Sequence, residues 1–261
     1  MPRLIGFTCD GETLIGSLDA AEGATGVLIV AGGTEIRAGA HRGMASLARA
    51  LAAAGVPAFR FDRRGVGDSG GVNGGWESSA LDLAAAVAAF RAAQPQVSRV
   101  VGFGNCDGAT ALALFGADVG VDALVLGNPW IDDDSPLPPP AALRTRYVAR
   151  LLDPAAWRRL VTGGLWSGKL WRGLAGAASR SKASPLAKRI ARAIEVVPTT
   201  ILLAEGDRTA QQFAAALPTA AVTRIASSSH SFADAGDAVS AAIVATAKAV
   251  TEVNSVTSTH G

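Results

Sequence analysis

Runs of apolar, β-branched residues alternate with helix-like segments along most of this chain of 261 residues. The run at 26–31 is apolar at nearly every position, as in a strand that is buried on both faces of a sheet. Strand-like runs lie at 26–31, 58–61, 97–103, 123–126, 199–204 and 221–225, and helix-like segments at 43–54, 77–91, 107–116 and 237–250. This alternation predicts an α/β fold with a mostly parallel central sheet and helices on both faces.

The first residues predict an antiparallel addition to that sheet. Two alternating runs, 4–9 and 12–18, flank Asp10-Gly11, a dipeptide typical of two-residue β-hairpins. Cys9 ends the first run, and we expect it to pack inside the hairpin. The length of the chain favours one large domain over two small ones.

Composition argues against several classes of protein. Two cysteines, Cys9 and Cys106, are too few for a disulfide scaffold or a cysteine-built zinc site. The three histidines, His41, His230 and His260, lack the spacing of metal ligands. No apolar stretch is long enough to cross a bilayer, and the first residues do not resemble a secretion signal. We therefore expect a cytoplasmic protein without a metal or other cofactor.

The strand and helix rhythm stops after Trp130 and resumes at the run 199–204. The intervening segment carries three consecutive aspartates, three consecutive prolines and then arginine-rich amphipathic stretches. We predict a core formed by residues 1–130 and 196–251, interrupted by a helical cap at 131–195. The polar residues 252–261 are predicted to be a disordered tail.

The predicted cap is strongly basic. Residues 141–195 hold twelve Lys and Arg residues against Asp153 and Glu195, a net charge of +10, whereas the rest of the chain carries −8. Four of the five tryptophans, Trp130, Trp157, Trp166 and Trp171, lie in or beside the cap. One interpretation is peripheral contact with an anionic membrane or lipid-linked substrate. The other is that the tryptophans pack the cap onto the core and the charges face water.

Residues 97–108 have the layout of a nucleophile elbow, with Cys106 where serine is usual. Gly104 and Gly108 flank the cysteine at two positions on either side, where side chains would collide with neighbouring backbone in so sharp a turn. A thiol there would lie at the positive end of the following helix, which favours thiolate. The alternative is an inert, buried structural cysteine.

Two further candidates follow strands that are expected to end at the same edge of the sheet. Asp207 follows the run 199–204, and His230 follows the run 221–225. Each alone has an ordinary explanation, since an aspartate after a strand often caps a helix and a loop histidine is often incidental. Together they supply the base and the orienting acid that a nucleophilic cysteine needs, because the carboxyl ends of parallel strands converge.

An acyl-transfer site also needs hydrogen-bond donors for the oxyanion. The predicted donors are the backbone N–H of Asp107 and one from the loop after the strand 26–31, either Gly33 or Thr34. Glu35 on that loop is a possible auxiliary group that could take the thiol proton. A carboxylate exposed to solvent is the simpler interpretation of Glu35. Neither nucleic-acid-binding strand motifs nor a helix-turn-helix pattern accompanies the basic segment.

The chain resembles the α/β-hydrolases over residues 4–130 and 196–250, including the glycine-rich loop 62–70. The order cysteine, aspartate, histidine is that of the same superfamily. More narrowly, residues 31–42 and 102–108 resemble the type 1 hydrolases associated with the exosortase A system, bacterial proteins found beside exopolysaccharide and protein-sorting machinery. The resemblance implies Cys106, Asp207 and His230 as the triad. Cysteine in place of serine is a departure that dienelactone hydrolases also show.

These observations lead to three hypotheses. The first is a cytoplasmic hydrolase that cleaves a small or lipid-linked ester or thioester through Cys106, with peripheral contact to the inner membrane as one interpretation of its cap. The second is an acyltransferase, because a thioacyl intermediate also reacts with alcohols and amines. The third is a non-catalytic binding or scaffold module that keeps the fold.

Overall fold

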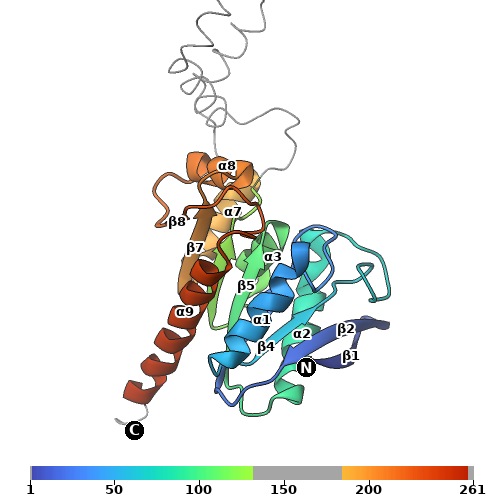
Figure 1. Ribbon diagram of the computed structural model, residues 1–261. Helices are drawn as coiled ribbons and strands as arrows, with labels where there is room; N and C mark the ends of the chain where they lie inside the picture. Colours follow the sequence, from blue (N-terminus) through green and yellow to red (C-terminus); the bar gives the residue numbers. More distant parts are fainter. Residues whose placement is uncertain (1, 132–183, 258–261) are drawn as a thin grey trace, which may run out of the picture.

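The computed structural model describes residues 2–131 and 184–257, which form one eight-stranded sheet with helices on both faces (Figure 1). The spatial order of the strands is β1-β2-β4-β3-β5-β6-β7-β8. Their bounds are β1 (Arg3–Cys9), β2 (Glu12–Asp19), β3 (Thr25–Val30), β4 (Ala58–Phe61), β5 (Arg99–Asn105), β6 (Ala123–Gly127), β7 (Thr199–Ala204) and β8 (Thr223–Ile225). From β4 to β8 all neighbouring strands are parallel.

The antiparallel start of the sheet is the predicted hairpin. Strands β1 and β2 pair with Cys9 opposite Glu12, so that Asp10 and Gly11 alone form the turn. Both residues have positive φ, 50° and 81°, as a type I′ turn requires, and this is why Asp-Gly stands there. Strand β2 then pairs antiparallel with β4, which joins the hairpin to the parallel part.

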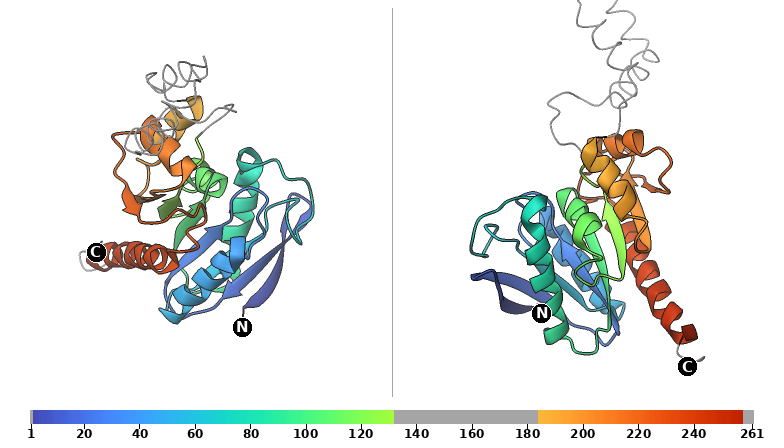
Figure 2. Two further views of the ribbon diagram at one scale, coloured as in Figure 1. Left: turned by 45° about the horizontal axis from the view of Figure 1, so that its top comes forward. Right: turned by 180° about the vertical axis from the view of Figure 1, so that it is seen from behind.

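The helices form two layers (Figure 2). Helices α1 and α9 share one apolar cluster on one face of the sheet, and α2, α3 and α7 share another on the opposite face. Their bounds are α1 (Gly43–Ala53), α2 (Ser79–Ala93), α3 (Asp107–Phe115), α7 (Pro185–Ala193), α8 (Arg208–Ala216) and α9 (Gly236–Thr257), with short 3₁₀ turns at Ala40–Arg42 and Trp76–Ser78. Strands β3 and β6 are buried at every position, as expected for strands covered on both faces.

The predicted α/β-hydrolase fold is therefore confirmed, and the differences are local. Helix α8, between β7 and β8, was not predicted, because its short apolar periodicity is interrupted by polar residues. Helix α9 continues to Thr257, whereas we expected the helix to end at Val250 and a disordered tail from residue 252. Residues 252–257 are helical in the structure, and the rest of the predicted tail, residues 258–261, lies outside the described residues.

Most of the predicted cap, including Trp157, Trp166, Trp171 and most of its basic residues, lies outside the described residues. The described part contains α7, whose Leu186, Ala187 and Ile190 are buried against the layer that includes α3. Arg189 of the same helix lies over the ring of Trp76, 5.5 Å from its centroid. This end of the insertion packs on the core. Contact with a membrane through residues 141–195 stays a prediction.

Candidate active site

Cys106 lies in a sharp turn between β5 and α3. Its backbone has φ 55° and ψ −126°, and it is the N-cap residue of α3. A Cβ on Gly104 would lie 2.7 Å from backbone atoms of Gly108, and a Cβ on Gly108 would lie 2.6 Å from the carbonyl oxygen of Val30. Both flanking glycines are therefore needed for close backbone approach, as the elbow pattern predicts. Strain of this kind is characteristic of functional turns.

Hydrogen bonds from the neighbouring strand end hold this turn in place. The Cys106 N–H donates to the carbonyl of Gly127, 3.0 Å away, and the Trp130 N–H donates to the carbonyl of Cys106 at 3.2 Å. The hydroxyl of Thr110 in α3 donates to the carbonyl of Trp130 at 2.6 Å. The elbow is thus fixed to the segment that follows β6, and the sulfur is left partly exposed.

Asp207 lies three residues after the end of β7 and contacts two parts of the molecule. One carboxylate oxygen accepts the Ala210 N–H at 2.9 Å and caps α8, while the other accepts the Nδ1–H of His230 at 2.8 Å. Burial raises the pKa of Asp207, but the hydrogen bonds from His230 and from the Ala210 amide overcome this and leave the pKa lowered. The helix-cap interpretation and the orienting-acid interpretation are both compatible with one side chain.

His230 lies in the loop after β8, between the aspartate and the cysteine. Its hydrogen bond with Asp207 and a second with the Cys106 side chain raise the pKa of His230 to about 10, against the opposing effect of burial. The imidazole is therefore protonated at neutral pH. An imidazolium beside a cysteine sulfur stabilises thiolate. The three side chains predicted from separate strand ends come together in the order Asp207, His230, Cys106.

Asn128 is a supporting residue that the sequence analysis did not identify. It is fully buried, and its backbone φ is +42°. Its side chain donates to the carbonyl of His230 at 2.9 Å and accepts the N–H of Ala204 at 2.9 Å. It thereby joins the end of β7 to the histidine loop. Its only signal in the sequence is its position two residues after the predicted strand 123–126.

The predicted oxyanion donors differ in their surroundings. Asp107 is the first residue of α3, and an N–H in the first turn of a helix has no partner within the helix. The N–H of Gly33 donates to the Asp107 carboxylate, so in this conformation it is engaged. Thr34 is exposed. That Gly33 or Thr34 binds an oxyanion stays a prediction, and for Gly33 it requires the carboxylate to release the amide.

Glu35 closes the turn that carries these residues. Its N–H donates to the carbonyl of Gly32 at 3.0 Å, and its carboxylate accepts the N–H of Ala40 at 3.3 Å. These contacts tie the carboxylate to its own loop. Its role as an auxiliary base for Cys106 stays a prediction.

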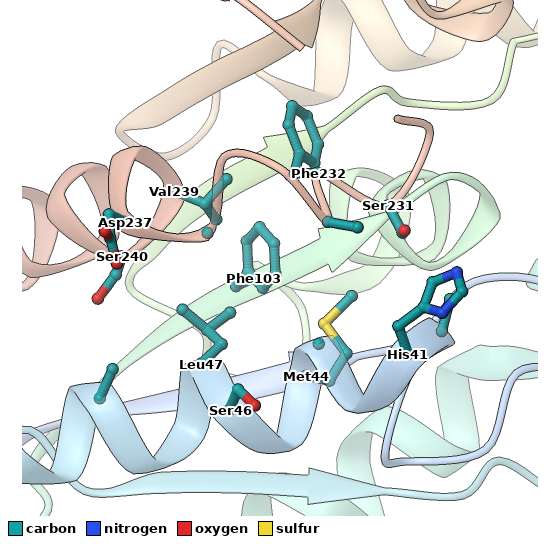
Figure 3. A pocket seen from close by; sticks show the side chains of 15 residues that line it. His41, Met44, Ser46, Leu47, Phe103, Ser231, Phe232, Asp237, Val239 and Ser240 are labelled. Atoms are coloured by element: carbon teal, nitrogen blue, oxygen red, sulfur yellow. The ribbon is translucent and has the colours of Figure 1, made fainter. Parts of the chain in front are cut away.

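A pocket of about 230 Å³ lies between α1 and the start of α9, beside the histidine loop (Figure 3). Met44 and Leu47 of α1, Phe103 of β5 and Phe232 give it an apolar wall. Ser231 and Phe232, which directly follow His230, form part of its lining. The pocket therefore borders the loop that positions the histidine.

The described residues also bear on metals and membranes. Residues 2–131 and 184–257 contain no cluster of three or more His, Cys, Asp or Glu side chains that could hold a metal ion. None of the helices within these ranges is both long and apolar enough to cross a membrane.

Several solved structures are similar to this chain. A search of curated proteins gives no match. Among solved structures, an esterase of Pyrococcus furiosus is 17% identical and covers 93% of this chain and 88% of its own, with a TM-score of 0.59. An α/β hydrolase from Sphaerobacter thermophilus is 25% identical over 91% of this chain and 98% of its own, with a TM-score of 0.53. A thioesterase domain from the curacin biosynthetic pathway is 16% identical over 94% and 99%, with a TM-score of 0.58.

These structural neighbours share the architecture of the sheet and its helices. Residues 27–242 match the alpha/beta hydrolase family, a span from β3 into α9 that contains the elbow, Asp207 and His230. The chain belongs to the alpha/beta hydrolase family.

Proposed function

We propose that this protein hydrolyses an ester or thioester, with Cys106 as nucleophile, His230 as base and Asp207 as the acid that orients the histidine. One observation carries the proposal: His230 is bonded to the Asp207 carboxylate, 2.8 Å away, and its pKa is raised by the neighbouring side chain of a cysteine held at positive φ. The esterase and the thioesterase among the structural neighbours support the same class of reaction.

Acylation begins with attack by the Cys106 sulfur on the acyl carbonyl carbon. A carbon–sulfur bond forms and the carbonyl electron pair moves to oxygen, where the Asp107 N–H is placed to stabilise the charge. When the oxyanion collapses, the bond to the leaving alcohol or thiol breaks. The His230 imidazolium gives that group its proton, so a neutral alcohol or thiol departs.

Deacylation uses the same groups in reverse. The now neutral His230 removes a proton from water, and the hydroxide attacks the thioacyl carbon. Collapse of the second oxyanion breaks the carbon–sulfur bond, which releases the acid and returns the thiolate beside a protonated histidine. Asp207 keeps the imidazole in the required orientation throughout.

A thiol nucleophile favours acyl transfer as a second candidate. The thioacyl intermediate reacts with an alcohol or amine by the same steps in which water would otherwise take part. The experiment below therefore includes both kinds of acceptor, and the ratio of products decides between hydrolase and acyltransferase.

The test is direct capture of the intermediate. The protein is mixed with a butyryl thioester of a small thiol, quenched in acid, digested and examined by peptide mass spectrometry. We expect the butyryl group on the peptide that contains Cys106. The same mixtures with added alcohol or amine report whether acid, ester or amide is released.

Cys9→Ala is the matched control, since Cys9 lies in the hairpin and has no part in the proposed reaction. Turnover should persist in Cys9→Ala and vanish in Cys106→Ala. Equal turnover by wild type and Cys106→Ala would overturn the proposal and favour a non-catalytic module.

The resemblance of residues 31–42 and 102–108 to exosortase-associated hydrolases supports a proposed setting in the cytoplasm, beside exopolysaccharide or protein-sorting machinery. A lipid-linked substrate at the inner membrane would suit the basic cap. Flotation with anionic vesicles at low salt tests this, and absence of binding would remove the membrane component.

A further inference from the structure

A carboxylate directly follows the proposed nucleophile and shares the N-terminal end of α3 with it. Asp107 is the neighbour of Cys106 and contributes the first N–H of α3. Both a thiolate and a developing oxyanion are negative, so an uncompensated carboxylate beside them would destabilise both. A cation beside Asp107 would offset this repulsion.

Arg63, from the glycine-rich loop after β4, supplies that cation. Its side chain is 4% exposed, and that of Asp107 is 15% exposed. One guanidinium nitrogen lies 3.2 Å and 3.1 Å from the two carboxylate oxygens of Asp107. The other nitrogen donates to the hydroxyl of Ser79 at 3.1 Å, which in turn donates to the carbonyl of Gly75 at 2.9 Å. The guanidinium is thus held from two sides.

Arg63 and Asp107 also form hydrogen bonds with the carbonyl and the N–H of Gly33. The Gly33 N–H donates to the Asp107 carboxylate, and the Gly33 carbonyl accepts from Arg63 at 2.7 Å. Gly33 has φ +58° and belongs to the turn that the Glu35 N–H closes onto Gly32. The loop after β3 is therefore attached to the elbow through a partly buried ion pair.

We propose that Arg63 is a positioning residue for Cys106: it neutralises the Asp107 carboxylate beside the nucleophile and holds the Gly33 loop against the elbow. Arg63 contacts both carboxylate oxygens, so Asp107 keeps a partner when a substrate oxygen takes over the Gly33 N–H. This inference rests on the proposed role of Cys106, but its first test needs no substrate.

The test compares Arg63→Met, Asp107→Asn and the double variant, all in a Cys9→Ala background that leaves one thiol. The readout is the second-order rate of alkylation of Cys106 by iodoacetamide, an uncharged reagent, at neutral pH. Loss of the cation should slow alkylation about tenfold, and loss of the carboxylate should speed it about threefold. The double variant should return to within about threefold of the parent.

Arg91→Met is the matched control, because it removes the same charge near the carboxyl end of α2. That helix runs antiparallel to the parallel strands, so its end lies away from their carboxyl edge. Its alkylation rate should equal that of the parent. Circular dichroism establishes that each variant is folded. If Arg63→Met is not folded, Asp107→Asn alone decides, since its side chain is partly exposed and asparagine preserves the shape.

Slower alkylation in Asp107→Asn, or a double variant as slow as Arg63→Met, would overturn the inference. Thioester turnover by the same variants is a second readout. If the alkylation pattern holds while the wild type cleaves no thioester, the charge compensation stands and the proposed hydrolase function fails. If turnover is present without the alkylation pattern, the hydrolase stands and the role of Arg63 fails.

Discussion

Cys9 is the last residue of β1 and Cys106 directly follows β5 in the same sheet, yet the surroundings of the two thiols differ. Cys9 ends β1, is 4% exposed, and donates from its sulfur to the Asp82 carboxylate at 3.5 Å. Burial raises the pKa of this thiol, and the Asp82 carboxylate raises it further. Cys106 follows β5, is partly exposed, begins a helix and bonds to a protonated histidine.

The chemistry of a thiol depends more on the group beside it than on its place on a strand. A carboxylate beside Cys9 raises the pKa of that thiol, whereas Cys106 lies beside the His230 imidazole at the N-terminus of α3. A neighbouring carboxylate, Asp107, is also present at Cys106. There Arg63 compensates its charge.

The largest expected contrast is in turnover. Cys106→Ala should lower the cleavage of a short acyl thioester by at least about a thousandfold, because the covalent route is lost. Cys9→Ala should change it less than about twofold. The measurement is the steady-state release of free thiol. Similar losses in both variants would mean that the fold, not the nucleophile, was damaged.

Asp207→Asn should follow with a loss of kcat of about a hundredfold or more, because the amide no longer holds the imidazolium or its tautomer. Asparagine is as good a helix N-cap as aspartate, so α8 should stay capped, and the free energy of unfolding should fall mainly through the lost ion pair with His230. Steady-state kinetics and urea unfolding measure the two effects. A kcat near that of the wild type would leave Asp207 only as a cap.

Alanine substitutions at the glycines near the two cysteines, Gly108 and Gly11, should lower the free energy of unfolding by different amounts. Gly108→Ala places a Cβ 2.6 Å from the carbonyl of Val30 and should cost roughly 3 kcal/mol by overpacking. Gly11→Ala meets no atom within 4 Å, but its φ of +81° should cost about 1 kcal/mol. Urea unfolding compares the two. A larger loss in Gly11→Ala would contradict the close backbone approach at the elbow.

The smallest effect is on the pH dependence of stability. The pKa of His230 is raised to about 10 in the folded protein, above its unfolded value of about 6.5. Its contribution is therefore fully present below about pH 6.5 and is lost as pH rises through about 10. Between pH 7 and 10 the wild type should lose more unfolding free energy than His230→Gln.

The raised pKa of Cys9 would add its own alkaline dependence, since unfolding frees its thiol to ionise. The His230 comparison is therefore made in the Cys9→Ala background. Parallel pH profiles for the two proteins would show that the histidine is not held as an imidazolium.

Much of this architecture could be predicted from local patterns. Asp-Gly marks the hairpin, alternating strand and helix segments mark the parallel sheet, and glycines two residues either side of Cys106 mark the elbow. Each of these patterns is informative because a short-range steric or periodic requirement restricts which residues can stand next to one another. The same logic placed Asp207 and His230 at strand ends on one edge of the sheet.

Other features depend on contacts between residues far apart in the sequence and leave no pattern in neighbouring residues. Arg63 and Asp107 lie 44 residues apart in sequence, and only the packing of two loops makes them a pair. Asn128 reaches His230 across 102 residues. The engagement of the Gly33 amide by Asp107 likewise depends on how the loop after β3 meets the elbow.

The sequence by itself determined the order of strands and helices, the sharp turn at Cys106 and the identity of the groups at one edge of the sheet. These follow from periodicity and from backbone sterics, which act over a few residues. The tertiary structure was needed to show that Asp207 also caps α8, that Arg63 pairs with Asp107, and that the Gly33 amide is engaged by the Asp107 carboxylate. Electrostatic partners are selected by distance in space, and folding brings together residues that the sequence keeps far apart.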